Sequence, residues 1–431
     1  MGRVRDEPGP GPRDHPLSVM LLGAGELSRE LVAAFQRLGA VVTAVDRYAD
    51  APAHGVADRS FVVTTSDPDE LIALIEREEP DFVVTEMPDR AGKPVVAMDA
   101  LTTIAERGVA DVVPTVRSGR LSLDREGMRR LAADELGLPT APFWFAGSVE
   151  ELKAVAKHAG YPLIVRPVSG RPGEGESVLV RAADIEPAWE RAVSAGGRVA
   201  NTRVLAETMV EFDYEVTLLA VRTAPGPANG RPAGEQGKPG ADVQFCEPIG
   251  HRMLDGGVLE SWQPQHLTSA ARDAAKSISG RIVNALGGRG IYGVELLVRG
   301  DEVYFSDVSP RPSDSGLVTL RSQRLSQFEL HARAILRLPV DTIMITPGAA
   351  HVVYAGSGTG SAAGVPDDER TERAILVLSG ALKVPESDVR MFGHLQSYPR
   401  RRLGVALATA ANVNIARDRA RDTATAVRKF W

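Results

Sequence analysis

The sequence predicts an α/β unit with a doubly wound parallel sheet at the N-terminus, followed by a larger α+β unit and a small closing segment. A chain of 431 residues is too long for one hydrophobic core, so two or three domains are expected. Strand and helix patterns alternate over about residues 17–122, which is typical of a parallel sheet. Beyond residue 123, most strand patterns follow one another directly, which favours antiparallel hairpins.

The N-terminal domain, residues 17–122, opens with SVMLLGAG, an apolar run typical of a buried strand that ends in glycines. ELSRELVAAFQRLG then has helical spacing and stops at Gly39, a favourable helix C-cap. The alternation continues through AVVTAVDRY, DELIALIEREEP and DFVVTE, which predicts a Rossmann-like sheet. Residues 1–16 lack an apolar core, so they are expected to be a disordered tail rather than a secretory signal.

The second unit, residues 123–345, begins with helix patterns in DREGMRRLAADELG and SVEELKAVAKHAG. Strand patterns follow in PLIVRP, ESVLVR, RVLAETMV, YEVTLLAV and QFCEPIGHR. Residues 223–242 hold five Gly and four Pro and no large apolar residue, which predicts a disordered loop between two strands. Residues 346–431 are expected to form a small C-terminal domain.

Composition excludes several classes of protein. The net charge is −6 and no basic stripe carries interleaved aromatic residues, which argues against nonspecific nucleic-acid binding. No apolar run is long enough to span a bilayer, so no membrane association is expected. The single cysteine, Cys246, rules out a disulfide framework and fits a reducing cytoplasm. A cytoplasmic enzyme is therefore the expected class.

The first candidate site is GAGELS, residues 23–28, followed by Asp46 after the second strand. This pattern raises the possibility of NAD binding, with the acid holding a ribose hydroxyl. The fingerprint is incomplete, because Ser28 stands where the third glycine belongs. An anion at the N-terminus of the following helix is an alternative that needs no complete fingerprint.

The second candidate is IVRPVSGRPGEGESV, residues 164–178, a glycine-rich turn between two strands. Such turns often cradle phosphates with backbone N–H groups. This turn also carries Glu174 and Glu176, whose charges would repel a phosphate. It is either a nucleotide loop, weakened by those acids, or a flexible hairpin.

The third candidate is a pair of acids, Glu295 and Asp307, placed symmetrically about Asp301. If residues 300–302 form a three-residue hairpin loop, the two acids lie directly opposite one another. Two carboxylates that close repel unless a cation separates them, and oxygen ligands suit Mg²⁺. The alternative is a solvated hairpin face, but the flanking residues are apolar and unpaired acids in a core are costly.

A fourth candidate is PRRRLGVALATA, in which three arginines, Arg400 to Arg402, precede an apolar stretch. These side chains either form a solvated charge run or grip a phosphate with forked hydrogen bonds.

Taken together, several motifs resemble formate-dependent phosphoribosylglycinamide formyltransferase, a family of the ATP-grasp superfamily that acts in purine synthesis. The resemblance runs from about Val19 to near residue 420. It implies a Rossmann-like substrate-binding domain, a central ATP-grasp domain and a small C-terminal domain. It also implies that formate attacks ATP to give formyl phosphate, which then formylates the amine of glycinamide ribonucleotide. The motifs are MLLGAGELSRELVAAFQRLG, VDRYADAPAHGVAD, DREGMRRLAADELGLPT, ESWQPQ, GVELLV, SPRPSDSGLVTL and RRRLGVALATA.

The resemblance also implies roles for individual residues. The substrate positions are Glu26, Leu27, Glu86, Asp314, His394, Arg401 and Arg402, and Arg311 and Asp314 would act in catalysis. The ATP positions are Arg125, Arg166, Arg171, Pro172, Gly173, Glu174, Gly175, Glu176, Glu207, Thr208, Met209, Val210 and Glu215. Glu207 would accept from the adenine amino group and Glu215 from the ribose hydroxyls. Glu295 and Asp307 fall on the two magnesium positions. A homodimer formed through the N-terminal domain is also implied.

The chain departs from the family pattern near the phosphates. Arg166 and His394 stand where the family has lysines, PGEGE replaces an SGKG-like loop, and Asp307 replaces the usual Glu. The stretch MPDRAGKPVVAMDA after Glu86 differs as well. Another ATP-grasp ligase with a different carboxylate or amine therefore remains open. A regulatory paralogue that binds nucleotide without turnover also remains open. An NAD-linked oxidoreductase is the least favoured of these alternatives.

Overall fold

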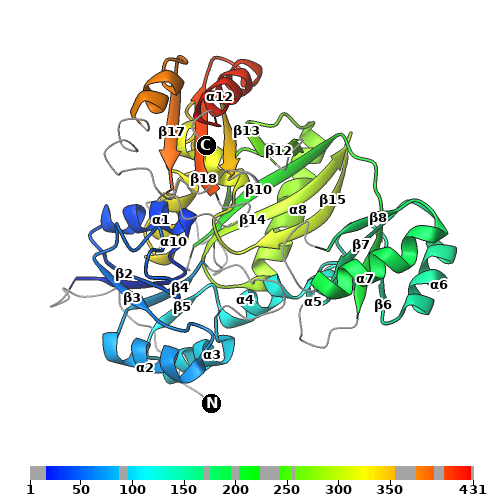
Figure 1. The fold of residues 1–431 in the computed structure, drawn as a ribbon, viewed down its shortest axis with the longest axis horizontal. Helices are drawn as coiled ribbons and strands as arrows, with labels where there is room; N and C mark the ends of the chain where they lie inside the picture. Colours follow the sequence, from blue (N-terminus) through cyan, green and yellow to red (C-terminus); the bar gives the residue numbers. More distant parts are fainter. Residues whose placement is uncertain are drawn as a thin grey trace, which may run out of the picture.

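The structure is a computed structural model that describes residues 16–86, 96–168, 175–195, 203–223, 242–254, 258–354, 375–392 and 402–428. Three sheets organise this part of the chain, and Figure 1 shows them as a lower-left lobe, a long central layer and a smaller lobe on the right. No helix among the described residues is long and apolar enough to cross a membrane.

The N-terminal sheet is parallel, with strand order β3-β2-β1-β4-β5. Helices α2 and α3 pack on one face and α1 on the other, so apolar side chains of the strands are buried on both sides. The predicted doubly wound fold is therefore confirmed. Its elements are β1 (Ser18–Leu22), α1 (Glu26–Gln36), β2 (Val41–Asp46), β3 (Arg59–Val62), α2 (Pro68–Glu78), β4 (Phe82–Thr85), α3 (Met98–Arg107), β5 (Asp111–Val113) and α4 (Val116–Leu123).

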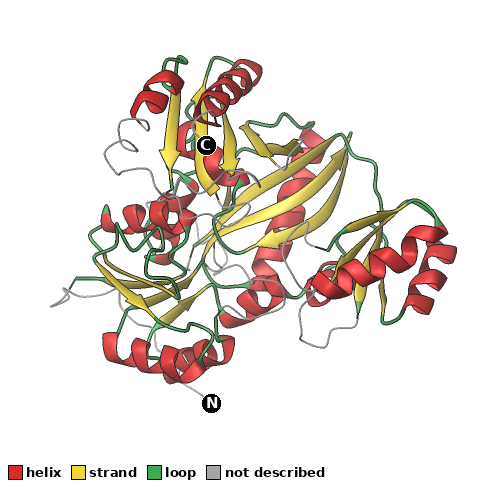
Figure 2. Ribbon diagram, in the orientation of Figure 1, coloured by secondary structure: helices red, strands yellow, loops and turns green. Residues whose placement is uncertain are grey.

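A small antiparallel sheet, which we call the small sheet, has the order β6-β9-β7-β8. Helices α6 and α7 cover one of its faces, as Figure 2 shows on the right. A short helix and a π-helical turn lead into it from the N-terminal domain. The elements are α5 (Arg125–Arg130), η1 (Leu131–Glu135), β6 (Phe143–Ala146), α6 (Val149–Ala159), β7 (Leu163–Pro167), β8 (Ser177–Leu179), η2 (Ala182–Asp184), α7 (Ile185–Ala195) and β9 (Val204–Thr208).

The large sheet has the order β15-β14-β10-β12-β13-β16-β18-β17, and β11 pairs with β10 at its side. Helix α8 packs against the strands at the β15 end of this sheet, with its apolar face in their core. The elements before the C-terminal segment are β10 (Tyr214–Arg222), β11 (Val243–Phe245), β12 (Ile249–Leu254), β13 (Val258–Gln263), α8 (Ser269–Leu286), β14 (Gly290–Arg299), β15 (Glu302–Ser309), η3 (Ser315–Val318), α9 (Thr319–Ser322) and α10 (Gln327–Ile335).

The C-terminal segment continues the large sheet instead of forming a separate one. Strand β16 (Gly348–Tyr354) pairs antiparallel with β13, and β18 (Arg402–Thr409) pairs with β16 and β17 (Ser387–Met391). Helix α12 (Val413–Arg428) packs on these strands (Figure 1). The domain limits 17–122, 123–345 and 346–431 stay a proposal, with the last limit falling just before a strand that is shared with the central unit.

Two expectations about loops lie outside the described residues, namely the tail before residue 16 and the loop within 224–241. One expectation is wrong in detail. Arg299 pairs with Glu302, so only Gly300 and Asp301 turn the hairpin, instead of three residues. A register shift between Glu295 and Leu296 then adds one residue to β15. The bulge restores the alignment that the longer loop would have given.

Candidate functional site

The fold gathers most of the expected site residues into two neighbouring clusters. The first, the Arg166 cluster, lies between the small sheet and the hairpin β14–β15. It comprises Arg125, Arg129, Arg166, Glu176, Glu207, Glu215, Glu295 and Asp307. The second, the Arg311 cluster, lies at the carboxyl ends of β1 and β4. It comprises Glu26, Glu86, Arg311, Asp314, His331, Tyr354 and Arg402.

Arg166, on β7, uses its guanidinium to reach two acids at once. Its Nε lies 3.0 Å from Glu176 Oε2, and its NH1 lies 3.2 Å from Glu207 Oε2. A planar fork can hold two carboxylates in this way, whereas a lysine ammonium is a compact point charge. Glu176, one of the two acids of the glycine-rich turn, is therefore the partner of the arginine that replaces the family's lysine.

Glu207, on β9, is also held by an arginine that the sequence analysis did not single out. Arg129 Nε donates to Glu207 Oε1 at 2.7 Å, and both side chains are almost fully buried. Arg129 NH1 also donates to the carbonyl oxygen of Ser306 on β15, at 2.5 Å. The Glu207 carboxylate thus joins the small sheet to the large one. Arg129 occupies Oε1, whereas Oε2 has only the 3.2 Å contact with Arg166, so an adenine amino group would share Oε2 with that guanidinium.

The two acids of the hairpin lie opposite each other, with Glu295 on β14 aligned with Asp307 on β15. Solvent reaches the Glu295 side chain, yet many protein atoms surround it. This desolvation, together with the charges of Asp307 and Glu215, raises the pKa of Glu295 to about 7. The part of this rise that comes from the two neighbouring carboxylates is repulsion between negative charges, which a bound cation would relieve. No cluster of three metal-binding side chains is found among the described residues.

Two further ATP positions belong to the same cluster. Burial raises the pKa of Glu215, although the charge of Arg166 opposes the shift. Burial lowers the pKa of Arg125, while Asp307 opposes that shift. Arg125 NH1 donates to the carbonyl oxygen of Pro167 at 2.7 Å, which ties α5 to the end of β7. Arg125 thus lies at the end of β7, and Glu215, at the start of β10, lies close enough to interact with Arg166.

The chain after β9 presents backbone groups beside the cluster. Thr208 N donates to the carbonyl oxygen of Pro142, and Met209 N donates to that of Pro162. The N–H of Val210 makes no hydrogen bond within the described part of the chain. An open backbone donor at a strand end can pair with the edge of a planar base. The expected hinge, Glu207 to Val210, therefore offers a backbone donor at Val210 in addition to the Glu207 carboxylate.

The Arg311 cluster forms where the strand order of the N-terminal sheet reverses, between β1 and β4. Ligands of doubly wound sheets bind outside the carboxyl ends of the strands at such a point. Glu26 lies in the first turn of α1 and Glu86 directly follows β4, and both side chains are buried. Leu27 is half-buried and packs against the apolar core. The switch point explains why two acids so distant in sequence come together.

Arg402, at the start of β18, closes this cluster from the C-terminal segment. Its Nε lies 2.6 Å from Asp314 Oδ1 and its NH2 donates to Oδ2 at 2.8 Å, while NH1 lies 3.7 Å from Glu26 Oε2. Burial alone would lower the pKa of Arg402, but the charge and hydrogen bond of Asp314, together with the charges of Tyr354 and Glu26, raise it on balance. Tyr354 OH donates to the same aspartate. Asp314 is thus oriented by two strands of the large sheet.

Arg311 connects the two clusters. Its NH1 donates to the carbonyl oxygen of Glu86 at 3.2 Å. Burial lowers the pKa of Arg311, and the charges of Glu86, Asp314 and Asp307 oppose that shift. Since Asp307 belongs to the first cluster and Glu86 to the second, one fixed positive charge interacts with both.

Some expected site residues are not placed. Arg171, Pro172, Gly173, Glu174, His394 and Arg401 lie outside the described residues. Gly175 is described, with φ of +71°, and a Cβ there would lie 2.5 Å from Ala195 Cβ. The turn therefore requires glycine at this position.

The structure also bears on the NAD alternative. Asp46 Oδ2 accepts from the backbone N–H of Ala24, and Oδ1 accepts from that of Arg47. Both carboxylate oxygens thus help to hold the loop after β1, so Asp46 has a structural role that does not depend on a ribose. The pattern of GAGELS followed by Asp46 therefore does not require a dinucleotide.

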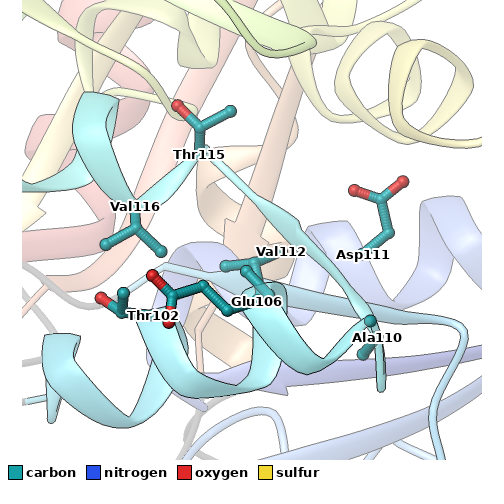
Figure 3. Close-up of a pocket in the computed structure, with 9 residues that line it drawn as sticks. Thr102, Glu106, Ala110, Asp111, Val112, Thr115 and Val116 are labelled. Carbon is teal, nitrogen blue, oxygen red and sulfur yellow. The ribbon is translucent and has the colours of Figure 1, made fainter. Parts of the chain in front are cut away.

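Three members of these clusters were missed by sequence reasoning, namely Arg129, His331 and Tyr354. Arg129 had a usable signal, since it lies one helical turn after Arg125. His331 and Tyr354 had none. A separate pocket of about 510 Å³ lies at the outer edge of the N-terminal sheet, between α3 and β5 (Figure 3). None of the expected site residues lines it.

Comparison with known proteins gives consistent matches. The ATP-grasp domain model matches residues 131–328, and the PurT C-terminal model matches 361–427. A formate-dependent phosphoribosylglycinamide formyltransferase of Rhodococcus jostii (strain RHA1) is 49% identical over 95% of this chain and 94% of its own length. The same-named protein of Burkholderia mallei (strain SAVP1) is 50% identical over 95% of each chain.

Two solved structures are similar along most of the chain. Glycinamide-RNase-transformylase T from Mycobacterium tuberculosis is 51% identical, with a TM-score of 0.75 over 95% of this chain and 99% of its own. N5-carboxyaminoimidazole ribonucleotide synthetase from Thermus thermophilus is 23% identical, with a TM-score of 0.74 over 95% and 98%. At that lower identity the second match shows the fold alone.

Proposed function

The chain belongs to the formate-dependent phosphoribosylglycinamide formyltransferase family, and on that premise we propose that it formylates glycinamide ribonucleotide at the expense of ATP. Formate attacks the γ-phosphorus of ATP, the bond to the bridging oxygen breaks, and formyl phosphate and ADP result. The amine nitrogen then attacks the formyl carbon, phosphate leaves and the nitrogen loses one proton. The carboxylate needs this activation because an unmodified carboxylate oxygen is a poor leaving group.

The observation that carries the proposal is the position of Arg311 between the two clusters. It interacts with Asp307 on the nucleotide side and with Glu86 and Asp314 on the substrate side. A fixed cation at the junction stabilises negative charge that passes from ATP to the acyl phosphate. Arg311 would therefore act in catalysis, and Asp314 would orient the acceptor.

ATP would bind between the small sheet and the hairpin β14–β15. The open N–H of Val210 supports an adenine position beside β9, and Arg125 and Arg166 support phosphate positions nearby. Arg166 uses Nε and NH1 for its two carboxylate partners, so its NH2 group would be the donor to a phosphate oxygen. Glu215 would face the ribose hydroxyls from β10.

The acids Glu295 and Asp307 fit Mg²⁺. They are opposed on adjacent strands, and the pKa of Glu295 is raised partly by its neighbour's charge. Magnesium is usually held by one or two carboxylates together with substrate phosphates, so two acids without a third protein ligand are sufficient. When bound, the ion would neutralise charge on the β- and γ-phosphates.

Glycinamide ribonucleotide would bind in the Arg311 cluster. Its amine suits the carboxylates of Glu26, Glu86 and Asp314, and its phosphate suits Arg402. Arg401 and His394 are part of the same proposal on the family resemblance alone. A homodimer and a cytoplasmic location also remain proposals. The buried, unpaired Cys246 is compatible with a reducing compartment.

The test is ADP release with ATP, formate and glycinamide ribonucleotide, each omitted in turn. The proposal expects formylated product and sustained ADP release only when all three are present, because formyl phosphate made without the acceptor has no amine to react with. ADP release that ignores formate would identify a different ATP-grasp ligase, and acetate and bicarbonate would then be tried as acyl donors. ATP binding by calorimetry without ADP release under any combination would support a regulatory role and overturn the proposal.

A further inference from the structure

His331 lies beside Glu86 and has no part in the reaction described above. It is fully buried on α10, and its Nε2 lies 3.4 Å from Glu86 Oε1. Each of these two atoms is buried and has no hydrogen-bond partner among the described residues. An unsatisfied buried polar atom is costly, so each atom is the other's available partner.

The tautomer of His331 is fixed by the opposite side of the ring. The backbone N–H of Ile291 donates to Nδ1 at 2.9 Å, so Nδ1 must be unprotonated. The one ring proton of the neutral imidazole is then on Nε2, pointing towards Glu86. The ring fits so closely because residue 290 is glycine, where a Cβ would lie 2.8 Å from the imidazole.

Helix α10 also contacts the segment that carries Asp314, the second acid of the substrate site. Gln327, one turn before His331, accepts from Ser313 N at 3.0 Å and donates to Ser313 O at 2.8 Å. Ser313 directly precedes Asp314. Residues four apart lie on the same face of a helix. One face of α10 therefore contacts Glu86 through His331 and the residue before Asp314 through Gln327.

We propose that His331 is a positioning residue that donates from Nε2 to Glu86 Oε1 and so leaves Oε2 to receive the amine of the substrate. This inference rests on the proposed function, because it assigns the amine to Glu86. The 3.4 Å separation shortens when the substrate closes the site, as hydrogen bonds at active sites often tighten only in the complex. The amine is thereby held with its lone pair towards the formyl carbon.

Two substitutions separate positioning from simple packing. His331→Asn keeps an acceptor near the Nδ1 position for Ile291 but removes the donor to Glu86. His331→Gln keeps a donor near the Nε2 position and removes that acceptor. We expect His331→Asn to raise KM for glycinamide ribonucleotide by about tenfold or more, with KM for ATP unchanged. We expect His331→Gln to stay within about threefold of the unsubstituted enzyme.

A double-mutant cycle with Glu86→Gln completes the test. If His331 acts through Glu86, His331→Asn adds little further loss in the Glu86→Gln background. Equal losses in both His331 variants, a parallel rise in KM for ATP, or full additivity with Glu86→Gln would overturn the proposal. If the unsubstituted enzyme shows no dependence on glycinamide ribonucleotide, the proposed function itself has failed instead.

A spectroscopic measurement covers the case in which a variant does not fold. The unsubstituted protein with ¹⁵N-labelled histidine is examined by NMR at pH 7, and the His331 signal is assigned from through-space contacts to its assigned neighbours, including Ile291, so no variant is needed. The Nε2–H tautomer is expected. An Nδ1–H tautomer or an imidazolium would overturn the proposal, because neither can accept from Ile291.

Discussion

Replacing Glu207 by Gln tests the buried link between the small sheet and the large sheet. Glu207 receives Arg129 on one oxygen at 2.6 and 2.7 Å and Arg166 on the other at 3.2 Å. The Gln side chain has almost the same shape but no charge, and its NH₂ group must face one of the two guanidiniums. Arg129 is then left buried without a counterion.

The expected cost follows from burial. The side chains of Glu207 and Arg129 are 4% and 7% exposed. Removing one partner of such a pair costs about 3–5 kcal/mol. Since Gln keeps one acceptor oxygen, we expect the lower end, about 3 kcal/mol, which corresponds to roughly a hundredfold change in an equilibrium constant. Glu176→Gln removes the other partner of Arg166, but that pair is 25% and 32% exposed, so about 0–1 kcal/mol is expected.

Hydrogen exchange measures this difference where it arises. Unfolding of the small sheet breaks the Arg129–Glu207 pair, so the opening free energy of β6, β7 and β9 includes its contribution. Amides of these strands should exchange roughly a hundred times faster in Glu207→Gln and within about fivefold of normal in Glu176→Gln. Equal acceleration in the two variants would refute the reasoning that burial makes the Glu207 pair the stronger link.

Three further predictions concern the two clusters and the large sheet. Glu295→Gln should abolish ADP formation while circular dichroism shows an intact fold, and near-normal turnover would refute the metal assignment. Asp314→Asn removes the charge that holds Arg402, so KM for glycinamide ribonucleotide should rise about tenfold or more, whereas an equal rise in KM for ATP would contradict this. Burial lowers the pKa of His251 from 6.5 to about 4. As pH falls below 6.5, the unfolded chain therefore binds a proton at His251 that the folded chain does not bind. Stability contributed by neutral His251 should therefore be complete above pH 6.5 and decline towards pH 4, as thermal unfolding across that range would show. The decline should be shallower in His251→Asn, and an unchanged slope in that variant would contradict the assignment.

The alignment of Glu295 with Asp307 was predicted correctly from the sequence, although the loop geometry assumed in that prediction was wrong. Symmetry about Asp301 predicts that Glu295 and Asp307 face each other, and they do. The prediction assumed a three-residue loop, whereas the hairpin turns on two residues and a bulge in β15 compensates. A bulge has no reliable sequence signal at Ser306, because it depends on how β15 packs and on the bond that Arg129 makes to that carbonyl.

The sequence by itself determined the parallel N-terminal sheet, the antiparallel hairpins and the family, because these follow from periodic patterns and from motifs within single segments. It also placed Glu26 and Glu86 after their strands, and the switch-point rule then brings them together. Only the tertiary structure decided which charges pair, as in Arg129 with Glu207, Arg402 with Asp314 and His331 with Glu86. These partners come from elements far apart in the chain. Local patterns fix the direction of a side chain on its own element, whereas the partner it meets depends on how separate elements pack.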